Sequence, residues 1–248
     1  LDVKDLHGFD YRGVEILKGL DLQVRAGEIV GIAGIDGNGQ TEMVEIITGL
    51  MKGESGQVLV NGVDVFNKPP RFGFEHGVSS IPADRQKHGL VLEFPVEDNL
   101  ILQKYNETPF SERHLLKRAV ISGHAVDAIE KFDIRPGGCS DRAAGTLSGG
   151  NQQKVIIARE VMNDKELLIA VNPTRGLDVG AIEYVHKYLV DQRNKGKAVL
   201  LVSFELDEII GLSDVIDVIF DGRIVASMPG KDADENTLGL LMAGGKVK

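Results

Sequence analysis

The chain has 248 residues and the composition of an ordinary globular protein, so its length allows one large domain or two small ones. Its formal net charge is -9 and it contains no basic stripe, so we expect no nucleic-acid partner, and its single cysteine, Cys139, excludes an internal disulfide. Its apolar runs have the length of strands and fall far short of the roughly 20 residues of a membrane-spanning helix, so the sequence predicts no crossing of the bilayer.

The first part of the chain predicts a change from antiparallel strands to a buried strand. Short alternating segments at Asp2–Leu6 and Leu20–Val24, separated by glycines, are typical of antiparallel strands. Glu28–Ala33 predicts a buried strand, and after a glycine-rich turn comes a helix with one apolar face, formed by Met43, Ile46, Ile47 and Leu50. A strand, a glycine loop and a helix in this order form the phosphate-binding arrangement of α/β nucleotide proteins.

The middle of the chain predicts an inserted helical subdomain. Gln57–Val65 returns to the strand pattern, and Ser79–Pro82 ends another short strand. Strand signals then vanish, and the charged segment Ser111–Phe132 has a helical pattern that ends at Pro136 and the two glycines after it. We therefore expect a helical subdomain at about residues 95–146.

The last third of the chain alternates strands with helices. Strand candidates lie at Leu167–Val171, Ala198–Val202 and Val215–Phe220. The helix Ala181–Asn194 separates the first two, and Asp221 and Gly222 make a hairpin turn after the third. This alternation predicts an α/β fold with a largely parallel sheet, which binds ligands at the carboxyl ends of its strands.

The most specific string of the sequence is LSGGNQQK at residues 147–154. A Gly-Gly turn capped by serine before an amphipathic helix would account for it locally. The string also resembles the signature of ATP-binding-cassette (ABC) ATPases. That resemblance implies that Ser148, Gly149, Gly150 and Gln152 lie at a helix start and present hydrogen-bond donors and a positive dipole end to the γ-phosphate of a nucleotide held by a partner domain.

Residues 34–41 read GIDGNGQT and resemble the Walker A pattern G-x-x-x-x-G-K-[ST]. The glycines of the backbone cradle, Gly34, Gly37 and Gly39, are kept. Thr41 keeps the hydroxyl that would touch Mg²⁺, but Gln40 replaces the lysine and loses a charge-assisted hydrogen bond worth about 1.5 to 3 kcal/mol. A glycine turn without any phosphate remains an alternative.

Other residues near this loop bear on nucleotide binding in the same domain. Asp36 and Glu42 put carboxylates near the position of triphosphate oxygens. The resemblance implies a contact from Asn38 in the cradle, and it places Tyr11 where the family has an aromatic ring that stacks on adenine. Packing of a lone tyrosine is the alternative.

The remaining motifs have lost the groups that act on a nucleotide. Residues 167–178 read LLIAVNPTRGLD, which is similar to the family's h-h-h-h-D-E-P-T-x-x-L-D. Val171 then stands at the Mg²⁺-binding aspartate and Asn172 at the catalytic glutamate, whereas Asp178 of the D-loop is kept. Phe204 replaces the switch histidine, and Ala83 replaces the Q-loop glutamine.

The losses are therefore selective. Gln40, Val171, Asn172 and Phe204 affect the domain's own pocket, where the resemblance implies no catalytic residue and weak or absent binding of ATP and Mg²⁺. The signature and Asp178, which act across an interface, are kept. The alternative is an inactive relative in which these four residues are tolerated and have no role.

The resemblance extends from Asp2 to the LLMAGG ending at residues 240–245. It implies one ABC cassette over residues 1–248, with a P-loop NTPase core, an N-terminal antiparallel β subdomain and the helical insert. Within the family, the strings PTRGLDVGA (173–181), IPADRQKHGLVLEF (81–94) and IDGNGQTE (35–42) are similar to the second, C-terminal cassette of a tandem sugar or nucleoside importer ATPase, closest to nucleoside importers. The chain begins at Leu1 without methionine or signal sequence, so we expect a segment of a longer polypeptide.

The resemblance also implies partners and a place in the cell. A companion cassette on the same polypeptide, transmembrane permease subunits and, indirectly, a solute-binding lipoprotein would assemble with the chain at the cytoplasmic face of the membrane. Such a chain is part of a transport ATPase. Two alternatives are a regulatory ABC module without a transport role, which the negative charge disfavours for ribosomes or DNA, and an independent P-loop kinase or hydrolase, which the missing lysine and acids disfavour.

Overall fold

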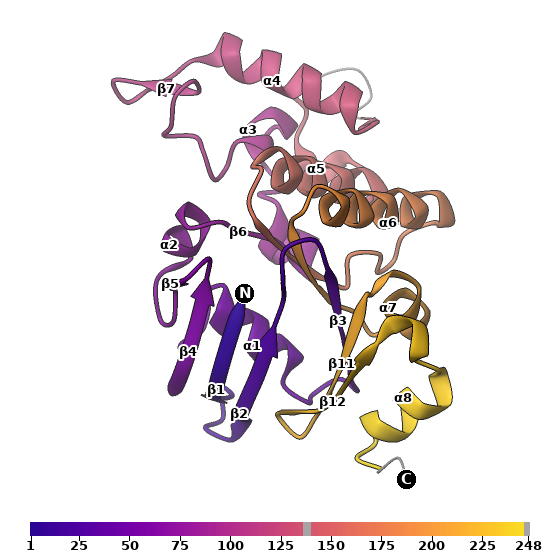
Figure 1. The fold of residues 1–248 in the computed structure, drawn as a ribbon. Coiled ribbons are helices and arrows are strands. Elements are labelled where there is room, and N and C mark those ends of the chain that lie inside the picture. Colours follow the sequence, from indigo (N-terminus) through magenta and orange to yellow (C-terminus); the bar gives the residue numbers. More distant parts are fainter. Residues whose placement is uncertain (136–139, 246–248) are drawn as a thin grey trace. The chain divides into compact units, whose positions relative to one another are not determined.

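Figure 1 shows the fold of the computed structural model, which describes residues 1–135 and 140–245. The chain forms two compact units. The first consists of Leu1–Ser80, Lys165–Asn172 and His186–Lys248, and the second of Ile81–Asp164 and Pro173–Val185. The helix end predicted at residues 136–138 and Cys139 lie outside the described residues.

The elements follow one another along the chain as the labels in Figure 1 indicate. The strands are β1 (Asp2–Phe9), β2 (Glu15–Gln23), β3 (Ile29–Ala33), β4 (Ser55–Val60), β5 (Val63–Asp64), β6 (Val78–Ile81), β7 (Ser111–Glu112), β8 (Leu115–Leu116), β9 (Leu167–Val171), β10 (Ala198–Val202), β11 (Val215–Phe220) and β12 (Arg223–Pro229). The α-helices are α1 (Gln40–Ile47), α2 (Pro70–Glu75), α3 (Val96–Leu100), α4 (Arg118–Lys131), α5 (Gly149–Met162), α6 (Val179–Asn194), α7 (Leu206–Leu212) and α8 (Glu235–Met242). Helical turns of other types are η1 (Arg85–Gly89), η2 (Ala144–Thr146) and η3 (Gly230–Asp232).

Two sheets carry the strands of the first unit. One has the order β2-β1-β4-β5 and is antiparallel throughout. The other has the order β12-β11-β3-β10-β9-β6, in which β11, β3, β10 and β9 run parallel and β12 runs antiparallel to β11. Every residue of β3, β9 and β10 is buried, as expected for parallel strands with both faces covered. The antiparallel N-terminal strands and the largely parallel sheet predicted from the sequence are confirmed.

The register of the parallel sheet determines which residues meet at its carboxyl edge. Val202 of β10 pairs with Val171 of β9 on one side and with Ile32 of β3 on the other. The three chain segments that follow these strands therefore begin at the same edge. They carry the phosphate loop, Asn172 and the segment around Phe204, as the sequence predicts for a nucleotide-type sheet.

Helix α1 is shorter than its apolar pattern predicts. Met43, Ile46 and Ile47 are buried as expected, but Leu50 lies beyond the end of the helix and is 63% exposed. Gly49 has a φ of 77°, which a helix cannot continue through, so the expectation for Leu50 is wrong.

The predicted strand Gln57–Val65 is a hairpin instead. Strands β4 and β5 pair antiparallel around Asn61 and Gly62, whose φ angles are 50° and 79°. An Asn-Gly pair with two positive φ angles is the preferred two-residue hairpin turn, and the period-2 pattern on both sides masks it.

The second unit contains α3, α4 and α5, whose packing forms its helical part. The helix predicted over Ser111–Phe132 is confirmed only from Arg118 to Lys131. Residues 111–116 instead form the hairpin β7–β8, whose turn residues Arg113 and His114 have positive φ. The expectation of no strand in this region is therefore wrong. The sequence does not reveal the hairpin, because neither Arg113 nor His114 is a usual turn former. The insert expected at about residues 95–146 falls inside this unit, and its boundaries stay a prediction.

Within the described ranges, 1–135 and 140–245, the structure contains no helix with both the length and the apolar character that a bilayer crossing requires.

Candidate functional site

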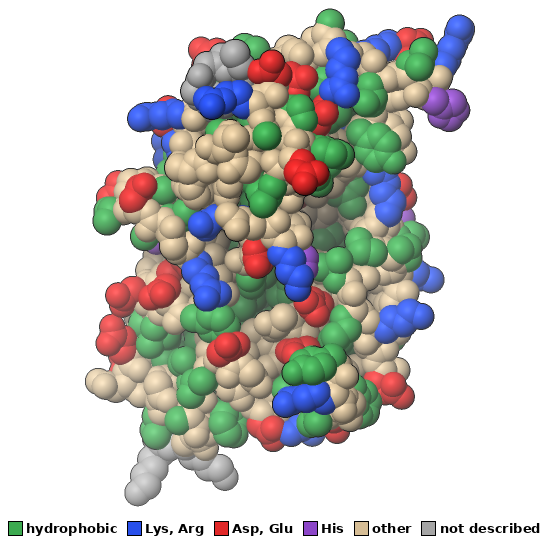
Figure 2. Space-filling model, turned by 180° about the vertical axis from the view of Figure 1, so that it is seen from behind, with side chains coloured by type: hydrophobic (Ala, Val, Ile, Leu, Met, Phe, Trp, Pro, Cys, Tyr) green, Lys and Arg blue, Asp and Glu red, His purple; other side chains and the backbone are tan. Residues whose placement is uncertain are grey.

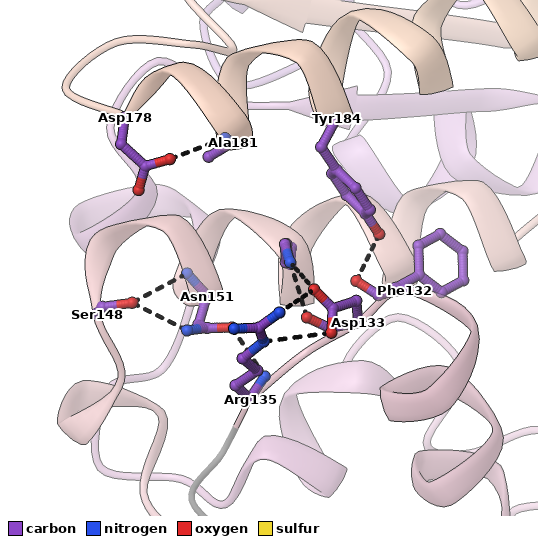
Figure 3. A network of polar contacts seen from close by, with 9 residues as sticks. Phe132, Asp133, Arg135, Ser148, Asn151, Asp178, Ala181 and Tyr184 are labelled. Carbon is purple, nitrogen blue, oxygen red and sulfur yellow. Dashed lines mark hydrogen bonds and ion pairs between the residues drawn. The ribbon is translucent and has the colours of Figure 1, made fainter.

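A polar cavity of about 350 Å³ lies beside the start of α5, within the second unit. Figure 3 shows the residues around it and the bonds between them. Its lining combines the signature, the segment after α4 and the start of α6, namely Asp133, Arg135, Ser148, Gly150, Asn151, Lys154, Asp178, Gly180, Ala181 and Tyr184. We call it the signature cavity.

Ser148 caps the first turn of α5, as the sequence predicts. Its Oγ accepts hydrogen bonds from the backbone N–H of Asn151 at 3.4 Å and from the Asn151 side-chain Nδ2 at 3.0 Å. The backbone N–H of Arg135 donates to Asn151 Oδ1 at 2.8 Å, which fixes the orientation of this amide. A hydroxyl has two acceptor positions and one donor, so the Ser148 proton is left to donate to an acceptor in the cavity.

Two cationic groups line the same cavity as this hydroxyl. The Nζ of Lys154 donates to the backbone oxygen and to Oδ2 of Asp133, both at 2.8 Å, and lies 4.8 Å from the centre of the Tyr184 ring. The Arg135 guanidinium contacts the same carboxylate at 3.3 Å. The hydrogen bonds from Lys154 and then Arg135 lower the pKa of Asp133, which therefore stays ionised at neutral pH. The lining thus holds two cations and two carboxylates, Asp133 and Asp178.

Asp178 and the signature lie together in this cavity, a proximity that the sequence did not predict. Asp178 Oδ1 accepts from the backbone N–H of Ala181 at 2.9 Å, at the start of α6. A Cβ added to Gly150 would lie 3.9 Å from Asp178 Oδ2, so the two motifs are neighbours in this cavity.

Gln152 does not line the signature cavity. Its side chain is 3% exposed, donates to the backbone oxygen of Ala144 at 3.4 Å and accepts from Gln86 at the same distance. Its expected contact with a partner's nucleotide stays a prediction. Sequence reasoning missed Asn151, which the N-cap pattern could have identified, because a capping side chain bonds the third residue after it.

The phosphate loop, residues 34–41, lies in the first unit and is held by hydrogen bonds within the loop and to Asp221. Gln40 is 3% exposed, and its Nε2 donates to the backbone oxygen of Ile35 at 3.1 Å. Asn38 donates to the same oxygen through Nδ2 at 3.0 Å and accepts from the backbone N–H of Asp221 through Oδ1 at 2.8 Å. The side chains that replace or flank the usual lysine therefore bond the protein itself.

The three glycines expected in the cradle are required for two different reasons, a positive φ angle and a close contact. Gly37 and Gly39 have φ angles of 88° and 105°, which only glycine adopts readily. Gly34 is confined, because a Cβ there would come within 2.5 Å of Gln40 Nε2. The loop therefore keeps the backbone conformation of a phosphate cradle at Gly37 and Gly39, and the Gln40 side chain lies against Gly34.

Asn172 ties the two neighbouring strand ends together. Its backbone N–H donates to Val202 O at 2.7 Å, and its Oδ1 accepts from the backbone N–H of Phe204 at 3.0 Å. Asn172 has a φ of 44°, which asparagine tolerates better than most residues. Val171 is 7% exposed and belongs to the hydrophobic cluster of this unit. Phe204 is 41% exposed.

Val171 and Asn172, at the expected metal and base positions, supply no carboxylate for Mg²⁺. Mg²⁺ in nucleotide sites is held by carboxylates and substrate phosphates, but Val171 offers no oxygen and the Asn172 amide is already bonded to Phe204. Thr41, the residue predicted to contact the metal, is exposed and offers its hydroxyl oxygen. In the ranges 1–135 and 140–245, no group of three or more His, Cys, Asp and Glu side chains is arranged to hold a metal ion.

Two further predicted positions are exposed. Tyr11 is 95% exposed, and the Arg12 guanidinium carbon lies 5.5 Å from its ring centre. The tyrosine ring is therefore accessible to a stacking partner. Ala83 is exposed in the second unit and lines a cavity with Asp84 and Arg85.

On the face shown in Figure 2, Lys and Arg side chains are scattered among Asp and Glu side chains. The described residues of that face form no continuous basic stripe. This mixture accords with the net charge of -9.

Comparison with known sequences identifies related proteins. Residues 17–175 match the ABC transporter family. The chain is 53% identical over 239 residues to the guanosine import ATP-binding protein NupO of Bacillus subtilis. This match covers 96% of this chain and 47% of NupO. It is 51% identical to the nucleoside import ATP-binding protein NupA of Lactococcus lactis (100% and 49% covered) and 43% identical to the glucose import ATP-binding protein TsgD13 of Haloferax volcanii (99% and 45%). The chain spans about half the length of these curated relatives.

Solved structures with the same fold include a nucleotide-free ATP-binding cassette from an ABC transporter, with a TM-score of 0.78 and 23% identity over 97% of this chain and 94% of that one. An ATP-binding subunit of an ABC transporter gives a TM-score of 0.79 and 24% identity, with 98% of each chain covered. Both comparisons concern the fold. They confirm the expected α/β class, with a cassette core, an antiparallel β subdomain and a helical region.

Proposed function

Because this chain belongs to the ABC transporter family, we propose that it is an ATP-binding cassette of an importer for nucleosides or sugars. Nucleosides are favoured, since NupO and NupA, at 53% and 51% identity, are named for guanosine and nucleoside import, whereas TsgD13 at 43% is named for glucose import. The half-length match to these relatives supports the further proposal that the chain is one of two cassettes on a single polypeptide, and the motif pattern favours the second.

We propose different roles for the chain's own nucleotide pocket and for the signature cavity. In the chain's own pocket, Gln40 and Asn172 bond the protein backbone and Val171 packs in the core, so we infer that this pocket does not hydrolyse ATP. The signature cavity keeps its donors, so it completes the ATP site of the companion cassette. The observation that carries this proposal is the Ser148 hydroxyl, which lines the cavity and accepts two hydrogen bonds from Asn151, so that its proton is available to donate.

ATP held by the companion would supply the γ-phosphate whose transfer to water drives transport. Ser148 would donate its proton to a phosphate oxygen, and the N–H groups at the start of α5 would add their donors and the positive end of the helix dipole. Asn151 would hold the serine oxygen in place, and Asp178 would keep the start of α6 beside it.

The partners follow from this role. The companion cassette would face the signature cavity, and transmembrane permease subunits would anchor the pair at the cytoplasmic face of the membrane. A solute-binding lipoprotein would act indirectly, by delivering the solute to the permease. Nucleic acid is not among the proposed partners.

Uptake by the reconstituted importer tests this function. The full-length polypeptide, its permease subunits and its receptor are placed in lipid vesicles, and ATP-dependent uptake of labelled guanosine, uridine, ribose and glucose is measured. We expect uptake of nucleosides over sugars. ATP-independent uptake, or copurification with nucleic acid in place of a permease, would contradict the proposal.

A further inference from the structure

Arg85 connects two segments that are far apart in the sequence. Its Nη1 donates to the backbone oxygen of Arg175 at 3.0 Å. Its Nη2 lies so close to Gly149 that a Cβ on this glycine would come within 2.7 Å of it. The guanidinium therefore lies between the first residue of α5 and the loop that leads to Asp178, all within the second unit. We call these two contacts the Arg85 bridge.

The position of this guanidinium has an energetic cost. The Nε of Arg85 is buried and has no hydrogen-bond partner, and burying such a donor is unfavourable. A buried polar group that is only partly satisfied calls for a reason beyond local packing. The contacts made by the other two nitrogens provide one, because they join two motifs of the signature cavity.

The base of Arg85 is itself fixed. Asp84 accepts from the backbone N–H groups of Gln86 and Lys87 at 3.0 and 2.9 Å, which caps η1 at its start. Arg159 of α5 donates to the backbone oxygen of Gly89 at 2.8 Å, which ties the other end of η1 to the signature helix. Arg85 therefore projects from a segment that cannot shift freely relative to α5.

The loop that reaches Asp178 is fixed at two points. Gln153, a buried residue of α5, donates to the backbone oxygen of Pro173 at 2.8 Å. The Arg85 bridge holds the same loop two residues later, at Arg175. Between them, these bonds set the distance from the start of α5 to Asp178.

We propose that Arg85 is a positioning residue, which keeps the signature and Asp178 at a fixed spacing so that both meet the companion's nucleotide together. This inference rests on the proposed function. Donors stabilise a transition state fully only when they are preorganised, and a displacement of about 1 Å can cost roughly 10²-fold in rate. Arg85 itself does not line the signature cavity, so its proposed effect on catalysis is indirect.

Matched arginine variants test the proposal in the full-length importer with its permease. Arg85→Ala removes the bridge. Arg175→Ala is the control: it removes an exposed arginine side chain that lines the cavity of Ala83, Asp84 and Arg85, but it leaves the backbone oxygen that Arg85 binds. We expect Arg85→Ala to lower kcat for ATP hydrolysis by about 10-fold to 100-fold, with KM for ATP within about 2-fold, because ATP is bound by the companion's own loop. Arg175→Ala should keep kcat within about 2-fold. Arg85→Lys, which can make one of the two contacts, should fall between Arg85→Ala and the parent protein.

Hydrogen exchange separates the bridge from its effect. Amides of residues 149–151 and 173–178 should exchange faster in Arg85→Ala than in Arg175→Ala, while amides of β9 and β10 should be unchanged. Faster exchange with an unchanged kcat would overturn the positioning role, and so would equal losses of kcat in the two variants. The variant Ser148→Arg is assayed in parallel. If Ser148→Arg leaves ATP turnover intact, the proposed function itself fails. If turnover is lost in Ser148→Arg but is normal in Arg85→Ala, only the role of Arg85 is overturned.

Discussion

The phosphate loop at residues 34–41 and the turn at residues 147–151 are both glycine-rich turns that enter a helix, but their polar groups point to different partners. In the first, the Gln40 amide bonds the backbone of Ile35. In the second, the Ser148 hydroxyl keeps its proton after accepting two bonds from Asn151. A glycine backbone suited to phosphate is therefore not sufficient evidence for a phosphate site, because the direction of the donors decides.

The two helix starts differ in charge as well. Helix α1 carries Glu42 in its first turn, which places a carboxylate at the positive end of its dipole. Helix α5 has no acidic residue in its first turn, and the cavity at its start holds two cations, Arg135 and Lys154, and two carboxylates, Asp133 and Asp178. The positive dipole end of α1 is therefore offset by a carboxylate in its own first turn, whereas that of α5 is not.

The largest expected effect compares the two helix starts directly. In the full-length importer, Ser148→Arg places a bulky side chain where the companion's γ-phosphate would bind, and the donors at the start of α5 are lost together. We expect ATP-dependent uptake to fall by about 10²-fold or more. Gln40→Ala changes a pocket that we propose does not hydrolyse ATP, so uptake should largely survive. Loss of uptake in Gln40→Ala with normal uptake in Ser148→Arg would reverse the assignment of the two regions.

A second prediction concerns the attempt to restore the metal ligand in the chain's own pocket. Val171→Asp puts a carboxylate into the hydrophobic cluster of the first unit, where burial disfavours its charge. We expect the free energy of unfolding to drop by about 3 kcal/mol and the Tm by about 6–12 °C, without any gain in ATP hydrolysis. The measurement is thermal unfolding at pH 5 and pH 8.

The variant Val171→Asn, which has the size of the aspartate variant, serves as its control. It introduces a polar group without a charge, so its loss of stability should not depend on pH. Burial raises the pKa of a carboxyl group, so the aspartate variant should become less stable than the asparagine variant as pH rises above that pKa. Equal stability of the two variants at pH 8 would show that the carboxylate is not buried at this strand end, and ATPase activity in Val171→Asp would show that the strand end accepts a metal ligand.

A third prediction concerns the bond between the two strand ends. Asn172→Gly removes the acceptor of the Phe204 N–H but tolerates the positive φ, so the loss of stability measures the hydrogen bond. We expect about 1–2 kcal/mol, or a Tm lower by about 2–8 °C. Asn172→Asp keeps an oxygen at the same place and should lose less. Should both variants unfold at the parental temperature, the Asn172 amide would be free for another role, and the contrast with Ser148 would weaken.

Much of the fold was predictable because its signals are local. The strands β9, β10 and β11 appear at the predicted residues, since a short apolar run between turn residues is typical of a buried strand. The start of α5 was predictable from its serine cap. The hairpin β7–β8 was not, because Arg113 and His114 adopt positive φ without the usual turn residues.

The candidate site was predictable only in its motif residues. The motif strings identify Ser148 and Asp178 one by one, but their meeting in one cavity was not predicted, and Arg135, one of the two cations of that cavity, comes from outside the motifs. Arg135 lies 13 positions before the serine, and only the packing of the segment after α4 brings it there. The spacing of residues within a string determines helix faces, whereas contacts between strings depend on the tertiary structure.

The smallest expected effect compares the pH responses of the two units. In the signature cavity the pKa of Asp133 is lowered, chiefly by the hydrogen bond from Lys154. The stability from this carboxylate is therefore present above its unfolded pKa of about 3.9 and lost as pH falls through the folded pKa. Asp133→Asn should lower the Tm by no more than about 2 °C, equally at pH 5 and pH 8, because the group is exposed.

In the first unit the pKa of His7 is raised, chiefly by its hydrogen bond to Glu15 at 2.8 Å. The stability from this pair is present below the unfolded pKa of about 6.5 and lost as pH rises through the folded pKa, the opposite sign and a different window from Asp133. The Tm difference between the parent and His7→Gln should therefore shrink from pH 6 to pH 8, while that of Asp133→Asn stays constant over the same range. If the Asp133→Asn difference also changed between pH 6 and pH 8, the signature cavity would titrate near neutrality, and its charges would not be as fixed as the bonds among Asp133, Arg135 and Lys154 require.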